Sequence, residues 1–174
     1  MNTFIAARMS DTTLEKVRQV CLTNWTAWEE ILFAIAWTRQ GKSQDAFIED
    51  VYPFGHTQSR PNGVDLTDRS RIDMSAKLRA NNKEYLWQGH THYEAHGHPD
   101  YLSSPDKAMI ANSRREGKPS AYMLGCVTKT GKVILKLFND DAKEIPYVVT
   151  KEGASWQENM RNTEIYWPWA KAVA

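Results

Sequence analysis

The chain has 174 residues, a length that suits one domain with a substantial buried core. Its 22 Lys and Arg residues nearly balance its 21 Asp and Glu residues, so the charge gives no case for nucleic acid or an anionic membrane as a partner. The two cysteines, Cys21 and Cys126, form no CxxC pair and support neither a disulfide framework nor a thiolate zinc site.

The predicted elements alternate between helical and extended patterns. In chain order we expect a helix over 11–24, strands over 31–37 and 46–52, an irregular surface loop over 56–65, a helix over 70–81, a strand over 83–88, a helix over 105–115, strands over 121–127 and 132–138, a short strand at 147–149 and a helix over 156–166. Ser104, followed by Pro105, is the expected N-cap of the helix at 105–115. This order predicts an α/β fold, a single domain with one mixed sheet flanked by helices.

The N-terminal residues lack the cationic start and continuous apolar core of a signal peptide. The longest apolar run, over residues 31–37, is too short to span a bilayer. We therefore expect a cytoplasmic protein, or one delivered by a route that needs no signal peptide.

A metal site is predicted where the strand at 83–88 leads into two histidines, His90 and His92. Residues i and i+2 of a strand point to the same face, so both imidazoles can reach one ion. Asp106 follows after a polar loop and can add a carboxylate oxygen. Two His and one carboxylate with an open position are a catalytic zinc arrangement, although other divalent ions also accept these ligands.

Hydrolysis at such a site needs a carboxylate outside the ligand set to accept and return a proton. Glu29 and Glu30 stand directly before the apolar run 31–37, where a strand entrance can face a metal on a neighbouring strand. We favour Glu30, because it adjoins the run, and leave Glu29 as the alternative.

In this order, the early Glu, the His-x-His pair and Ser103-Ser104-Pro105-Asp106 resemble the motif of the JAMM (MPN+) zinc metalloproteases over residues 12–139. The resemblance implies a JAMM/MPN fold, which is cytidine deaminase-like. It also implies His90, His92 and Asp106 as zinc ligands, Glu30 as general base and acid, and Ser103 as a stabiliser of the oxyanion. It leaves 140–174 as a C-terminal extension of unknown role.

This chain departs from the family pattern at three places. Tyr93 stands where a proline is usual, the loop is a few residues longer, and the glycine expected after the Glu is absent. A second pair, His96 and His98, keeps the proline but lies too close to Ser103 in the sequence. We prefer His90 and His92, because a strand fixes their geometry.

The function that the resemblance implies is zinc-dependent isopeptidase or peptidase activity, hydrolysing an amide bond by metal-activated water. Its substrates would be proteins or peptides, ubiquitin-like conjugates among them. The alternatives are a catalytically inactive JAMM-like scaffold or binding module, and a metal-dependent hydrolase of another bond such as a nuclease, which the lack of a basic stripe disfavours. The simplest non-functional interpretation is a histidine-rich surface loop beside an acid favoured by a helix dipole.

Overall fold

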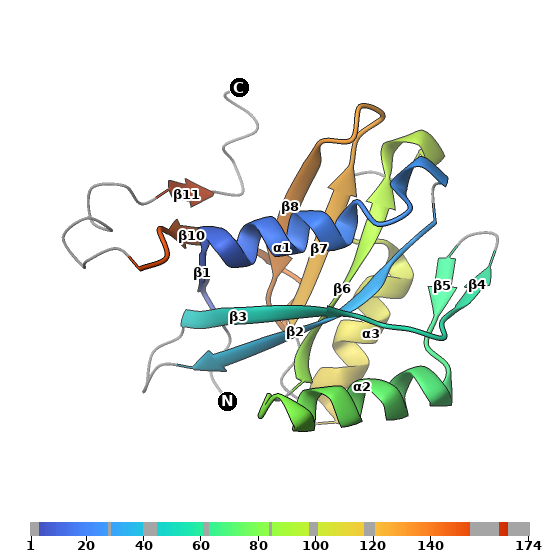
Figure 1. The fold of residues 1–174 in the computed structure, drawn as a ribbon, viewed down its shortest axis with the longest axis horizontal. Coiled ribbons are helices and arrows are strands. Elements are labelled where there is room, and N and C mark those ends of the chain that lie inside the picture. The colour runs from blue at the N-terminus through green and yellow to red at the C-terminus, as the bar shows by residue number, and fades with distance from the viewer. Residues whose placement is uncertain are drawn as a thin grey trace.

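Within the part of the chain that the structure describes, nine strands form one mixed sheet (Figure 1). The computed structural model describes residues 4–27, 29–39, 45–60, 63–83, 85–97, 101–116, 121–153 and 164–166. Its elements are β1 (Ala6–Ser10), α1 (Asp11–Cys21), the 3-10 turn η1 (Trp25–Ala27), β2 (Leu32–Arg39), β3 (Asp45–Pro53), β4 (Gln58–Arg60), β5 (Gly63–Asp65), α2 (Asp68–Ala80), β6 (Tyr85–Tyr93), the 3-10 turn η2 (Glu94–His96), α3 (Ser104–Arg115), β7 (Ala121–Val127), β8 (Val133–Phe138), β9 (Glu144–Ile145), β10 (Tyr147–Thr150) and β11 (Glu164–Tyr166).

The sheet order is β11-β10-β1-β3-β2-β6-β7-β8-β9. β1 pairs in parallel with β10 and β3, β6 pairs in parallel with β7, and the other neighbours are antiparallel. α1 packs on one face, and α2 and α3 pack on the other. The predicted α/β class, with one mixed sheet flanked by helices, is confirmed.

The apolar run over residues 31–37 is explained by burial on both faces of β2. In β2, Phe33 and Ile35 enter the cluster under α1, while Leu32 and Ala34 pack beneath α2. A strand covered on both faces needs apolar residues at every position, so the alternation typical of a half-exposed strand is absent. β2 is therefore a rigid neighbour for β6.

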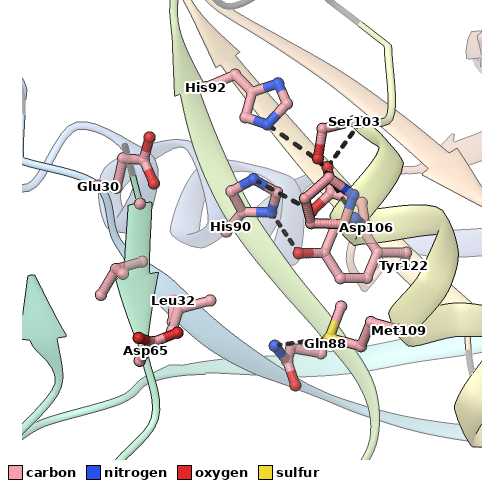
Figure 2. Close-up of a pocket in the computed structure, with 13 residues that line it drawn as sticks. Glu30, Leu32, Asp65, Gln88, His90, His92, Ser103, Asp106, Met109 and Tyr122 are labelled. Atoms are coloured by element: carbon pink, nitrogen blue, oxygen red, sulfur yellow. Dashed lines mark hydrogen bonds and ion pairs between the residues drawn. The ribbon is translucent and has the colours of Figure 1, made fainter. Parts of the chain in front are cut away.

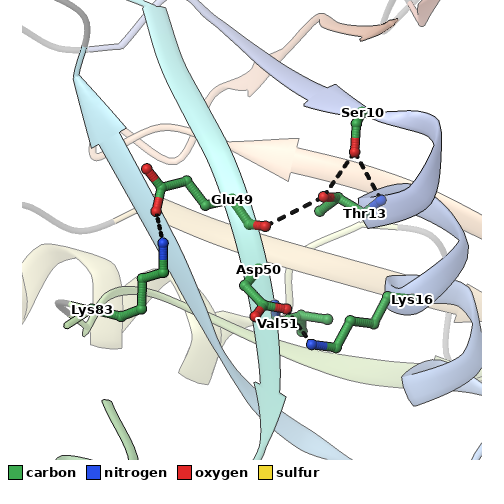
Figure 3. Close-up of polar contacts among 7 residues, drawn as sticks. All are labelled: Ser10, Thr13, Lys16, Glu49, Asp50, Val51 and Lys83. Atoms are coloured by element: carbon green, nitrogen blue, oxygen red, sulfur yellow. Dashed lines mark hydrogen bonds and ion pairs between the residues drawn. The ribbon is translucent and has the colours of Figure 1, made fainter. Parts of the chain in front are cut away.

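Polar contacts fasten α1 to β3 (Figure 3). Ser10 caps the helix, since its hydroxyl accepts the Thr13 N–H at 3.1 Å. The Thr13 hydroxyl donates to the Glu49 carbonyl at 3.3 Å, and Lys16 forms an ion pair with Asp50. These contacts fix the helix against the strand beside the main core.

The sheet extends beyond residues 12–139 at both ends. β1, which the sequence analysis does not assign, lies between β3 and β10, and the Asn139 side chain donates to the Phe4 carbonyl at 3.0 Å. The short strand predicted at 147–149 is confirmed as β10. The helix predicted over 156–166 is wrong at its end, where β11 pairs with β10, and its residues 156–163 lie outside the described residues.

The predicted irregular loop at 56–65 is also corrected. β4 and β5 pair there as a small antiparallel hairpin, with Ser59 opposite Val64. Each of these strands has only three residues, too few to show the alternation that marks a strand in a sequence. Among the described helices, none combines the length and apolar character needed to cross a bilayer.

Candidate metal centre

His90 and His92 lie inside β6 rather than after it, because the strand continues to Tyr93 instead of ending at residue 88 as predicted. In the parallel pairing with β7, they lie opposite Leu124 and Cys126, which pack beneath α3. Both imidazoles therefore share the α3 face, as the strand period requires.

Asp106 reaches the same place from the first turn of α3 (Figure 2). His90 Nε2 is 3.8 Å from Asp106 Oδ1, and His92 Nε2 is 3.7 Å from Asp106 Oδ2. The three potential ligand atoms lie within 4.8 Å of one another, and the residues are only 7%, 3% and 8% exposed. The structure thus brings together the three predicted ligands.

Zinc fits this donor set. Ligand atoms at about 2.0–2.2 Å from a tetrahedral ion lie roughly 3.3–3.6 Å apart, close to the separations between the histidine nitrogens and the carboxylate oxygens. Two imidazoles and one carboxylate leave a fourth position open, as in catalytic zinc sites.

Ser103, rather than the predicted Ser104, is the N-cap of α3. Its hydroxyl accepts the Asp106 N–H at 3.3 Å, and its own N–H donates to Asp106 Oδ2 at 2.9 Å, which completes a capping box. The predicted cap is therefore one residue too late, because the reciprocal bonds with Asp106 are made by Ser103. This cap holds the carboxylate at the metal group and places the Ser103 side chain in the pocket lining.

Tyr122 is a functional candidate that the sequence analysis misses. Its hydroxyl is hydrogen-bonded to His90 Nδ1, and the residue is 2% exposed on β7. A partner at Nδ1 orients the ring and leaves Nε2, the atom facing Asp106, for a metal. No local motif reveals this contact, because it depends on the pairing of β6 with β7.

The structure distinguishes the two candidate bases. Glu30 lines the same pocket as His90 and His92, and Figure 2 shows it across the cavity from them. Glu29 is exposed, and its carboxylate accepts a hydrogen bond from Asn24 Nδ2 at 3.2 Å. Of the two, Glu30 is therefore the one that lines the pocket.

Of the alternative histidine pair, the structure describes His96, which lies outside this group. His96 is exposed in η2, with its ring 5.7 Å from that of Tyr93. His98 lies outside the described residues. Among the described residues, the metal-ligand group consists of His90, His92 and Asp106.

The group opens into a cavity of about 410 Å³ between β5 and the start of α3. Its described lining includes three carboxylates, those of Glu30, Asp65 and Asp106, and includes no Lys or Arg. Gln88 and Met109 also line it, with Gln88 Nε2 at 3.6 Å from the Met109 sulfur. The carboxylates, with no Lys or Arg beside them in the described lining, favour cations and neutral groups over anions in this cavity.

No protein-family model matches the chain, and no curated protein matches it. Among solved structures, it is similar to the solution structure of protein DSY2949 from Desulfitobacterium hafniense, with a TM-score of 0.60 and 19% sequence identity. The match covers 84% of this chain and 94% of that one. At this identity the likeness shows a shared fold.

Proposed function

We propose that the protein is a zinc-dependent isopeptidase or peptidase of the JAMM (MPN+) type. The observation that carries this proposal is the buried group of His90, His92 and Asp106 in one cavity with Glu30. Three ligands with an acid outside the ligand set are what metal-assisted amide hydrolysis requires.

Zinc bound by the three ligands would polarise the substrate carbonyl and lower the pKa of a water at the open position. Glu30 accepts the proton of the attacking water and then donates it to the nitrogen of the leaving amine. One carboxylate can do both, because the first transfer makes it the acid that the second needs.

Ser103 supports the same reaction from the opposite wall. Its hydroxyl oxygen accepts the Asp106 N–H, so the hydroxyl hydrogen can be donated to a carbonyl oxygen that gains negative charge. A donor in such a position can be worth about 3–4 kcal/mol in the transition state.

The substrates we propose are proteins or peptides, with ubiquitin-like conjugates as the class that the motif resemblance implies. The lining carboxylates support an amine leaving group, since a lysine amine released from an isopeptide bond is cationic at neutral pH.

The test compares zinc-loaded wild type with Glu30→Gln and with the matched control Glu29→Gln. The substrates are a labelled peptide whose lysine Nε is joined to the C-terminal glycine of a ubiquitin-like protein, and linear peptides. We expect Glu30→Gln to lower turnover by about 10²-fold or more while keeping its zinc. Glu29→Gln should match wild type.

Two results would contradict the proposal. Equal turnover by wild type and Glu30→Gln would remove Glu30 from the chemistry. Zinc-loaded wild type that cleaves none of the amides would favour the inactive scaffold.

A further inference from the structure

Two side-chain hydroxyls of β6 contact the backbone on either side of Glu30. The pairing of β2 with β6 ends at Leu32 opposite His90. One residue earlier, the Thr91 N–H still donates to the Ile31 carbonyl at 3.1 Å. The Ile31 N–H, however, donates to the Thr91 hydroxyl at 2.9 Å, where a continuing ladder would use a carbonyl. The two segments therefore begin to part at Ile31.

A second side-chain hydroxyl of β6 contacts the same segment on the other side of Glu30. The Tyr93 hydroxyl donates to the carbonyl of Glu29, which is 64 residues away in sequence. Thr91 and Tyr93 are both 0% exposed, so water cannot readily replace either bond. Glu30 lies between the two anchored residues, with its backbone tied on each side to β6.

Alternate side chains of β6 lie on opposite faces of the sheet. His90 and His92 face α3 and Asp106, whereas Tyr93 packs in the core cluster beneath α1. One strand thus carries two of the three metal ligands on one face and contacts the Glu30 segment from the other.

We propose that Tyr93, assisted by Thr91, is a positioning residue that fixes Glu30 against the His90, His92 and Asp106 group. The proposal rests on the proposed function for its catalytic consequence, but its structural part stands on these hydrogen bonds. It also gives a reason for a tyrosine where the resembling pattern has proline, since proline has no hydroxyl to reach the Glu29 carbonyl.

The test uses Tyr93→Phe in the full chain, with Tyr147→Phe as the matched control. Tyr147 is also buried and donates to a backbone carbonyl, that of Leu135 at 3.4 Å, but it lies in β10, which forms no part of the site. Hydrogen–deuterium exchange is measured at the amides of residues 30–32, together with zinc affinity and steady-state kinetics on the isopeptide substrate.

We expect Tyr93→Phe to speed exchange of the Ile31 amide by about tenfold, because its segment loses one anchor. Zinc affinity and KM should stay at the wild-type values, while kcat falls by about tenfold or more. Thr91→Val, which removes the acceptor of the Ile31 N–H, should speed the same exchange. Tyr147→Phe should change none of these quantities.

The proposal is overturned if the exchange rate of the Ile31 amide is the same in Tyr93→Phe as in wild type. It is also overturned if Tyr147→Phe raises this rate as much as Tyr93→Phe does. So would a Tyr93→Phe variant that loses zinc affinity, since Tyr93 would then act on the ligands. If wild type shows no turnover, the proposed function and the catalytic consequence fail, and the exchange result alone decides whether Tyr93 fixes the segment.

Discussion

Tyr122 shows how a single residue can tune a candidate metal site without being a ligand. Its buried hydroxyl is hydrogen-bonded to His90 Nδ1, on the ring edge opposite the atom that faces Asp106. Partners of this kind fix the orientation and tautomer of a histidine, and their loss typically weakens metal binding by about 10–100-fold.

We therefore expect Tyr122→Phe to weaken zinc binding by about 10–100-fold with the fold intact. The measurement is zinc competition against a chromophoric chelator, with circular dichroism to verify folding. Unchanged zinc affinity would show that the Tyr122 hydroxyl has no role in orienting His90.

At the same scale, the site residues differ in how well the sequence predicts them. His90, His92 and Asp106 can be predicted because the alternation of a strand and the spacing of a motif are both visible within a short stretch of sequence. Glu30 and Glu29 remain alternatives, since a one-residue choice depends on where the chain leaves the β2 ladder. Tyr122 is missed because its role depends on which strand lies beside β6.

At the scale of elements, β6 carries both candidate histidine ligands, and Gly89 lets this strand pack closely between β2 and β7. Gly89 lies opposite Phe33 of β2 and Met123 of β7. A Cβ built there would lie 2.6 Å from Phe33 Cζ and 2.7 Å from the Met123 carbonyl oxygen. A backbone oxygen cannot move away as a flexible side chain can.

Gly89→Ala should lower the free energy of unfolding by about 1–3 kcal/mol through overpacking, and should weaken zinc binding at the adjacent His90. Gly55→Ala is the control, because its Cβ would meet nothing within 4 Å. Urea denaturation of both variants measures the effect. A Gly89→Ala variant as stable as Gly55→Ala would contradict the close packing of β6.

The contact of α1 with β3 makes a pH-dependent contribution to stability. Burial alone would raise the pKa of Asp50, but hydrogen bonds from Lys16, Tyr52 and the Val51 amide hold this pKa below its ordinary value of 3.8. A carboxyl with a lowered folded-state pKa stabilises the fold above its unfolded-state pKa, and this stabilisation is lost as the pH falls through the folded-state pKa.

Asp50→Asn should therefore be less stable than wild type at pH 7, and this difference should shrink below the ordinary pKa of 3.8. Denaturant titrations at a series of pH values measure it. A difference that is constant with pH would mean that ionisation of Asp50 contributes nothing.

For the whole molecule, the order of helices and strands is enough to predict an α/β domain with one mixed sheet. The parallel pairing of β1 with β10 joins strands that lie more than 130 residues apart in the sequence, and this pairing leaves no local signal. The short β4–β5 hairpin is missed for a different reason, since polar flanks of three residues carry no usable period.

Elemental mass spectrometry of the purified protein tests whether His90, His92 and Asp106 hold zinc. Wild type should contain about one zinc per chain. His92→Ala should lose this zinc, and the double variant His96→Ala/His98→Ala should keep it. Wild type that holds no zinc, even after zinc loading in the absence of chelators, would show that this group does not bind zinc. Zinc lost in the double variant and kept in His92→Ala would place the zinc site at the other histidine pair.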